Sequence, residues 1–313
     1  MRKPQNAERI VGRIYQHDLS VKTVQNHESA NYGNEFIAGN LEVATDDAML
    51  NVIKVHFTYV TPTTKSGTEN KTYTVLKRII DENKTITSVG ADDALKVRID
   101  TALALNDFYN ANDELVSAKT NEGGFVTIIS DLGEEKERNT FTADMLITGV
   151  NHVDADSEKN IEEHVTVRGA IFNFRNDLLP VEFSVKNADG MKYFEGLGAT
   201  NAEPVYTKVW GRIESMTTTT TKEVESAFGE AAVRTFKNVS KDWVITGTAK
   251  EVYDFGDENV LTPAEVQKAA QDREVYLADV KKRNDEYKAS KASSTPATAT
   301  VAATATKTTG FSF

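Results

Sequence analysis

Glycines in the middle of apolar, largely β-branched runs constrain the fold of this chain more than any other feature of its sequence. The runs are 10–14 (IVGRI), 37–41 (IAGNL), 167–171 (VRGAI), 209–213 (VWGRI) and 245–249 (ITGTA). An interior glycine weakens a strand, so its repetition requires a structural reason. The available reasons are a β-bulge or the tight coil of a strand that turns the corner of a small barrel. The pattern therefore predicts strongly curved antiparallel sheets.

The first part of the chain, residues 1–133, has the strand order of a small barrel. We predict strands at 8–24, 35–45, 51–61, 94–106 and 114–130, and a short helix at 72–83. The third strand has apolar residues at every second position over most of its length, whereas the apolar residues of the helix recur at helical spacing. Three strands, a helix and two further strands are the order of an OB-type five-stranded barrel.

Residues 134–258 repeat this order in spacing, although not in residue identity. The predicted strands lie at 140–153, 164–174, 179–186, 205–216 and 242–255, with a helical or turn segment at 191–197. The predicted fold class is therefore mainly β, with two tandem OB-like five-stranded barrels, a C-terminal helix and a disordered tail. An all-β sandwich with a similar number of strands is the structural alternative.

A helix is predicted within residues 259–288, where the period of the apolar pattern changes. It begins at Thr262, Pro263 and Glu265, which form a capping box with proline at the first helical position. A narrow seam follows in steps of three and four residues. The seam positions are Val266, Ala270, Arg273, Leu277, Val280, Asn284 and Tyr287. Such a seam packs on the preceding domain or supports a homo-oligomer through a coiled segment.

Residues 289–313 form a tail in which 18 of 25 positions are Ala, Thr or Ser. This composition has too little bulky apolar surface to offset the entropy of ordering, so the tail is predicted to be disordered. Phe311 and Phe313 interrupt the pattern at its end. Two phenylalanines on a mobile tether could bind a pocket on another protein. An accidental apolar terminus is the alternative.

Composition excludes several classes of protein. The chain has 36 Lys and Arg against 47 Asp and Glu, a formal charge of −11, so a uniformly basic nucleic-acid coat is excluded but a local basic groove is not. Without cysteine, disulfide scaffolds, thiolate zinc sites and Fe–S clusters are excluded. The polar N-terminal segment and the lack of a long apolar run predict no export and no membrane partner, and favour the cytoplasm, of the host if phage-encoded.

No phosphate-binding loop, nucleophile elbow or His-Glu-x-x-His motif is present, so nothing in the sequence anchors an enzyme. The nearest approach to a metal site is His152, Asp154 and Asp156, with His164 nearby. Alternate residues of a strand point the same way, so the first three could converge on a cation. A polar loop that binds nothing is the favoured interpretation, and we predict no cofactor and no metal.

Cations beside aromatic residues on predicted strands indicate a different chemistry. Single-stranded nucleic acid is bound by aromatic faces that stack on bases and by Lys and Arg that follow the phosphates. The candidates are Arg13, Tyr15, Lys54, Phe57, Tyr59 and Arg98 in the first unit, and Arg168, Phe172, Lys208, Trp210 and Arg212 in the second. Trp210 lies between two cations at two-residue spacing and is the best candidate platform. Burial in the core is the alternative for each ring.

Two segments also resemble a known family. Residues 9–14 (RIVGRI) and 34–44 (NEFIAGNLEVA) resemble the opening strands of OB-fold single-stranded DNA-binding proteins, especially divergent ones from bacteriophages. The resemblance covers roughly the first 130 residues and, more faintly, the second half. Members commonly carry a flexible C-terminal tail that recruits replication and repair proteins. The tail of this chain has a similar layout but lacks the acidic residues that usually precede the terminal phenylalanine.

These observations favour a non-catalytic single-stranded DNA-binding protein of phage-type replication or recombination. Its tail, through Phe311 and Phe313, would contact replication or recombination proteins. The alternative is a virion structural or assembly protein built from β-domains. A metal-dependent nuclease using His152 is the third hypothesis. Preference for DNA over RNA stays open.

Overall fold

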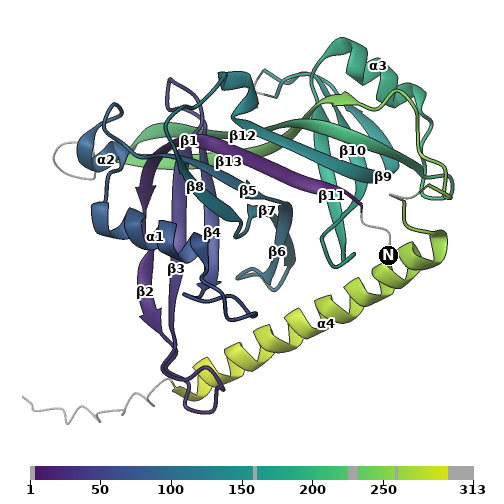
Figure 1. The fold of residues 1–313 in the computed structure, drawn as a ribbon. Helices are drawn as coiled ribbons and strands as arrows, with labels where there is room; N and C mark the ends of the chain where they lie inside the picture. Colours follow the sequence, from purple (N-terminus) through teal and green to yellow (C-terminus); the bar gives the residue numbers. More distant parts are fainter. Residues whose placement is uncertain (1–3, 158–160, 225–231, 258–259, 295–313) are drawn as a thin grey trace, which may run out of the picture.

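The fold is given by a computed structural model that describes residues 4–157, 161–224, 232–257 and 260–294. The predicted partner-binding residues Phe311 and Phe313 lie outside the described residues. Most of the described chain forms one sheet system that closes into two barrels, with a long helix along one side (Figure 1).

The first barrel consists of β1 (Asn6–His17), β3 (Glu35–Ala44), β4 (Val52–Val60), β5 (Lys96–Thr101) and β8 (Phe125–Ile129). β1 pairs with β3 and β5, β3 also pairs with β4, and β5 also pairs with β8, all antiparallel. A parallel bridge between His56 of β4 and Glu122, just before β8, closes the ring. Helices α1 (Lys71–Glu82) and α2 (Ile86–Val89) lie between the third and fourth barrel strands, which is the predicted OB order.

Local signals explain where α1 begins and ends. The Asn70 side chain accepts a hydrogen bond from the Thr72 N–H, and Asn83 ends the helix in the left-handed conformation at φ 45°. Leu76 and Ile79 are fully buried and join the barrel core. The helix therefore covers one end of the barrel.

Two insertions decorate this barrel. Strand β2 (Ser20–Thr23) lies between its first and second strands, and the hairpin of β6 (Leu103–Tyr109) and β7 (Leu115–Asn121) lies between its fourth and fifth. The predicted single strands at 94–106 and 114–130 were therefore wrong in extent, because each is divided in two. Gly123 and Gly124 have φ of 62° and 116°, which breaks the second segment at a place that favours glycine.

The second barrel repeats the arrangement after a 3₁₀ turn, η1 (Glu135–Glu137). Its elements are β9 (Asn139–Val153), β10 (His164–Phe172), β11 (Leu178–Val185), α3 (Ala188–Gly196), β12 (Val205–Val224) and β13 (Ala232–Thr248). β9 pairs with β10 and β12, β10 with β11, and β12 with β13, while a parallel pairing of Ser184 with Val244 closes the ring. The prediction of two tandem OB-like barrels is confirmed.

β12 and β13 form a longer hairpin than the predicted strands at 205–216 and 242–255. The extra part of β12 includes the threonine run 217–221. These residues lack apolar alternation, but their β-branched side chains favour extended backbone.

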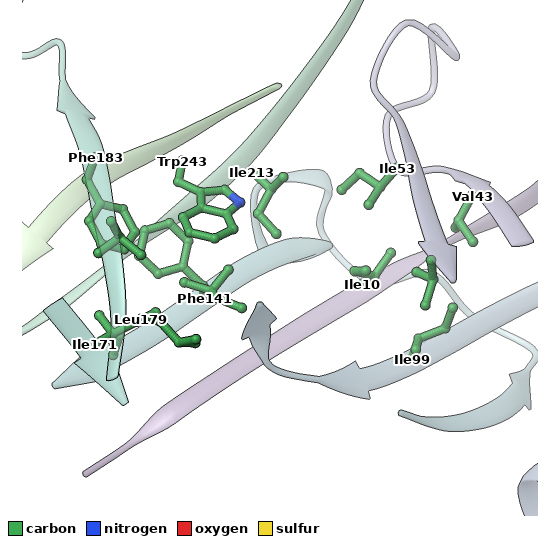
Figure 2. Close-up of a cluster of buried hydrophobic side chains, with 14 of the residues drawn as sticks. Ile10, Val43, Ile53, Ile99, Phe141, Ile171, Leu179, Phe183, Ile213 and Trp243 are labelled. Atoms are coloured by element: carbon green, nitrogen blue, oxygen red, sulfur yellow. The ribbon is translucent and has the colours of Figure 1, made fainter. Parts of the chain in front are cut away.

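The two barrels are fused rather than linked. Residues Asn6 to Ile10 of β1 pair with Ala143 to Asn139 of β9, so one sheet continues from ring to ring. Their interiors form one cluster of buried side chains. In Figure 2, Phe183 and Trp243 lie in the second barrel, Ile53 lies in the first, and Ile213 lies between them.

Two of the recurring glycines, Gly169 and Gly211, lie where strands bulge. The register shifts next to Gly169 and next to Gly211. A Cβ atom at Gly211 would lie 1.9 Å from the carbonyl oxygen of Val244, and one at Gly169 would lie 2.0 Å from a β9 carbonyl oxygen. The predicted link between these glycines and tight strand curvature is confirmed at both positions.

Helix α4 (Pro263–Ser294) runs diagonally below both barrels (Figure 1). The predicted capping box is present, since Thr262 N–H donates to Glu265 at 2.8 Å and Glu265 N–H donates to the Thr262 hydroxyl. The helix extends past the predicted end at 288, because the alanines beyond it are strong helix formers. Among the helices in the described ranges, none is long and apolar enough to cross a lipid bilayer.

The predicted seam of α4 packs onto the barrels with two changes, one of which is that Tyr287 is 59% exposed. Ala269 is buried in place of Ala270, next to Phe172 and Leu261 in a second apolar cluster. Val280 is also buried. The interpretation that the helix packs on the preceding domains is therefore confirmed.

Candidate nucleic-acid interface

A polar groove crosses the outer face of β3 and β4 in the first barrel. OB barrels bind oligonucleotides on the face of their second and third strands, with help from the loops after the first and fourth strands. Here the fourth-strand loop is the β6–β7 hairpin. The groove has a volume of about 420 Å³ and is lined by Asn40, Lys54, His56, Thr58, Asn106, Thr120, Glu122 and Lys241. We call it groove 1.

Two lysines give groove 1 its charge. Lys54 Nζ lies 3.1 Å from Glu42, and the His56 ring bonds the Asn40 side chain at 3.0 Å. Two effects lower the pKa of Lys241: partial desolvation is the larger, and repulsion from Lys54 is the smaller. A phosphate between the two ammonium groups would relieve this repulsion.

A buried carboxyl group lies near this groove. Glu8 of β1 is 3% exposed, and neither of its carboxyl oxygens has a hydrogen-bond partner in the structure. Burial raises the pKa of Glu8 well above its usual range, and the charge of Lys241 opposes the shift. Burial therefore favours the protonated form of Glu8, whereas its attraction to Lys241 favours the charged form of both groups.

A second groove crosses β10 and β11, the equivalent face of the second barrel. We call it groove 2. It is lined by Leu105, Ser117, Lys119, Thr148, Arg168, Gly169, Pro180, Val181 and Glu182. Lys119 Nζ lies 5.2 Å from the Trp243 ring centroid and 3.6 Å from Asp242. Desolvation lowers the pKa of Lys119, and Asp242 opposes the shift.

The β6–β7 hairpin forms a wall of both grooves. Asn106 and Thr120 line groove 1, whereas their neighbours Leu105 and Lys119 line groove 2. Successive residues of a strand point to opposite sides, so one hairpin from the first barrel faces both grooves.

Helix α4 holds this hairpin in place. The Arg273 guanidinium makes two bonds to the Asp107 carboxylate, at 2.7 and 2.8 Å, and the two side chains are only 10% and 1% exposed. Ser117 also donates to Asp107. Nearer the hairpin tip, Lys288 binds Asp113 at 2.7 Å.

The predicted platform Lys208, Trp210 and Arg212 lies on another face of the molecule. Trp210 is 41% exposed, so it is a surface residue rather than part of the core. Its indole packs across β13, where a Cβ atom at Gly247 would lie 2.4 Å from the indole nitrogen. β12 is the fourth strand of its barrel, so these residues lie outside the groove-forming strands.

Two predicted stacking residues are core residues. Phe57 and Phe172 are fully buried, so their rings cannot meet a base. Phe57 follows the inward set of β4, and Phe172 packs beneath α4 with Leu146 and Leu261. Their assignment to the binding surface was wrong, because barrel closure turns Phe57 inward and the docking of α4 covers Phe172.

The other predicted residues are spread over the surface. Tyr59 is 44% exposed, with its ring centroid 4.6 Å from that of Phe36, and Tyr15 is half-buried. Arg13 lies 3.4 Å from Asp47, and Arg98 binds Asp100 at 2.8 Å. Of the predicted set, the structure places only Lys54 in groove 1 and only Arg168 in groove 2.

Sequence reasoning did not select His56 or Lys119 for the interface. His56 follows Lys54 by two residues, so strand alternation was an available signal. Lys119 offered none, because the hairpin that carries it was read as part of a barrel strand.

The residues that came nearest to a metal-site pattern in the sequence have other partners. His152 Nδ1 bonds Glu195 at 2.8 Å, and this bond raises the pKa of His152. Across the described ranges, no three or more His, Asp or Glu side chains form a group suited to a metal ion.

Two closed OB-type barrels that share one sheet, with a hairpin between grooves 1 and 2, define a tandem OB-barrel protein. The chain belongs to the YorF family, whose family model matches residues 5–283. No curated protein matches its sequence.

Two solved structures with similar arrangements are forms of the single-stranded DNA-binding protein from Thermus aquaticus. The wild-type protein has 8% identity and a TM-score of 0.46, covering 80% of this chain and 95% of that one. A deletion variant has 10% identity and a TM-score of 0.45, covering 80% and 97%. These similarities are too distant to transfer a role to any residue.

Proposed function

We propose that this protein is a non-catalytic single-stranded DNA-binding protein that holds the strand along grooves 1 and 2. The observation that supports this proposal is the convergence of cations in both ligand faces of a chain with a net charge of −11. Lys54 and Lys241 face groove 1 beside one carboxylate, Glu122, and Lys119 and Arg168 face groove 2 beside one carboxylate, Glu182.

Phosphate contacts rather than base stacking dominate this binding. The residues lining the two grooves include no aromatic ring apart from His56. Four cations that each neutralise one phosphate give a slope of log K against log salt of about −3. Binding is therefore sequence-tolerant and strongly salt-dependent.

A role in phage-type replication or recombination is the finer part of this proposal. The resemblance of the first two barrel strands to phage single-stranded DNA-binding proteins supports it. Recruitment of partner proteins by Phe311 and Phe313, and assembly into a homo-oligomer, belong to the same proposal.

Titration of labelled oligo-dT, followed by fluorescence anisotropy at several salt concentrations, tests the function. The double variant Lys54→Ala with Lys241→Ala should weaken binding roughly tenfold and make the salt slope shallower by about 1.4. Lys192→Ala, an exposed lysine on α3, is the matched control and should change neither value. No binding of oligo-dT by the wild-type protein at low salt would refute the proposal and favour a virion assembly role.

A further inference from the structure

Five neighbouring strands present one outer face that spans both barrels. In the order β8, β5, β1, β9 and β12, each strand pairs antiparallel with the next. Directly paired residues point to the same side of a sheet. One continuous row across this face is Phe125, Asp100, Arg9, Thr140 and Arg212. Neighbouring rows add Arg98 and Thr127 at one end, and Ala7, Thr142 and Trp210 at the other.

This outer face is cationic in an acidic protein. Those ten residues include three arginines and a single carboxylate, Asp100, and Arg212 also shares a hollow with Asp46, Glu135 and Glu214. Asp100 is shared, because it lies 3.3 Å from Arg9 and 2.8 Å from Arg98. The two arginine side chains are 53% and 43% exposed, so each keeps donors directed to solvent.

An exposed ring marks each end of the face. Phe125 is 78% exposed on β8, and Trp210 is 41% exposed on β12. Four strand spacings separate β8 from β12, or about 19 Å. The positions between them carry Thr140 and Thr142, which are small enough to leave the surface open.

The spacing of these groups fits a polyanion with flat bases better than an apolar protein surface. A protein interface core requires contiguous apolar area depleted in charge, whereas here the rings are separated by arginines and threonines. Arginine planes and aromatic rings both stack on bases, and guanidinium groups bind phosphates in a fork geometry.

We propose that the outer face binds a second segment of the same single-stranded nucleic acid, between Phe125 and Trp210. This inference rests on the proposed function. The ligand grooves use β3, β4, β10 and β11, whereas the outer face uses the opposite wall of the first barrel and the first and fourth strands of the second. A single-stranded nucleic acid must therefore pass around the molecule to occupy both the grooves and the outer face, and only a long oligonucleotide can do so.

The test compares short and long oligo-dT, of about 8 and about 40 nucleotides, chosen from the range of OB site sizes. The variant Arg9→Gln with Arg212→Gln should bind the short oligonucleotide with unchanged affinity and the long one about tenfold more weakly. Lys54→Ala with Lys241→Ala should weaken both. The unfolding temperature of each variant should stay near that of the wild type.

Trp210 provides a second readout that does not require charge changes. The long oligonucleotide should quench an exposed tryptophan that the short one leaves unaffected, and Trp210→Phe should abolish this difference. Unchanged affinity of the Arg9 and Arg212 variant for the long strand, together with weakening by the Lys54 and Lys241 variant, would overturn the inference and leave the proposed function intact. Failure of the wild-type protein to bind either length would overturn both.

Discussion

Glu8 places a carboxyl group inside the junction of the two barrels without a hydrogen-bond partner. Because burial raises its pKa in the folded state, the stability it contributes is present below its ordinary value near 4.5 and is lost as pH rises through the raised pKa. Glu8→Gln cannot ionise, so its unfolding temperature at pH 8 should exceed that of the wild type by about 2 °C or more. The difference should close towards pH 4. Calorimetry across this pH range checks both points, and equal melting temperatures at pH 8 would contradict the prediction.

Gly247 determines where the Trp210 indole lies. A Cβ atom there would meet the indole nitrogen at 2.4 Å, and because Trp210 is 41% exposed we expect the indole to turn towards solvent. Gly247→Ala should therefore shift tryptophan emission to longer wavelength and increase iodide quenching, at a cost in stability of less than about 1 kcal/mol. Trp243 is 1% exposed and should contribute little to this change.

Gly256→Ala is the matched control, because nothing lies within 4 Å of an added Cβ atom there. Its emission should equal that of the wild type. An unaltered spectrum in Gly247→Ala would show that the indole does not rest on β13.

At the level of elements, α4 works as a clamp on the β6–β7 hairpin. Arg273→Ala leaves the Asp107 carboxylate buried without its bidentate partner, a change that typically costs about 3–5 kcal/mol. The hairpin should open locally, so its amide hydrogens should exchange faster while those of β1 and β9 stay protected. Since the hairpin lines both grooves, affinity for oligo-dT should also change.

Lys268→Ala provides the comparison on the same helix. It removes an exposed pair with Asp272, whose side chains are 74% and 57% exposed, so the expected loss is below about 0.5 kcal/mol. Equal rates of hydrogen exchange in the hairpin of Arg273→Ala and of Lys268→Ala would show that α4 does not hold the hairpin in place.

The order of elements was predictable because its signals are local. Apolar alternation, the bulge glycines and the Thr262 capping box each act within a few residues. Burial of Phe57 and Phe172 was not predictable, because it depends on barrel closure and on the docking of α4. Both involve contacts between residues that are far apart in the sequence. The same limit applies to the interface: Trp210 and Arg212 share a face by simple parity, whereas the two grooves depend on where a distant hairpin folds.

At the level of the whole molecule, side chains reinforce the shared sheet. Asn51, in the first barrel, donates to the Ile213 carbonyl at 3.0 Å and accepts from the Ser215 N–H at 2.8 Å. Asn139 also donates to the Ile213 carbonyl, at 2.7 Å. With one continuous core, both barrels should unfold in a single calorimetric transition.

Asn51→Ala should lower the free energy of unfolding by about 1–3 kcal/mol, because it removes partners from enclosed backbone groups. The transition should remain single, and Asn112→Ala in an exposed turn should have no effect on it. Two separate heat-absorption peaks in the wild-type protein would show that the barrels are independent.

The pairing of β1 with β9 has a mechanical consequence. Domains joined by a flexible linker can move apart when a bound polymer is pulled, because the linker extends under the force. Here the two barrels are joined by backbone hydrogen bonds between β1 and β9, so no flexible linker separates them. If a bound nucleic acid were pulled, the hydrogen bonds between β1 and β9 would resist separation of the two barrels. Each molecule would therefore keep a fixed length under tension.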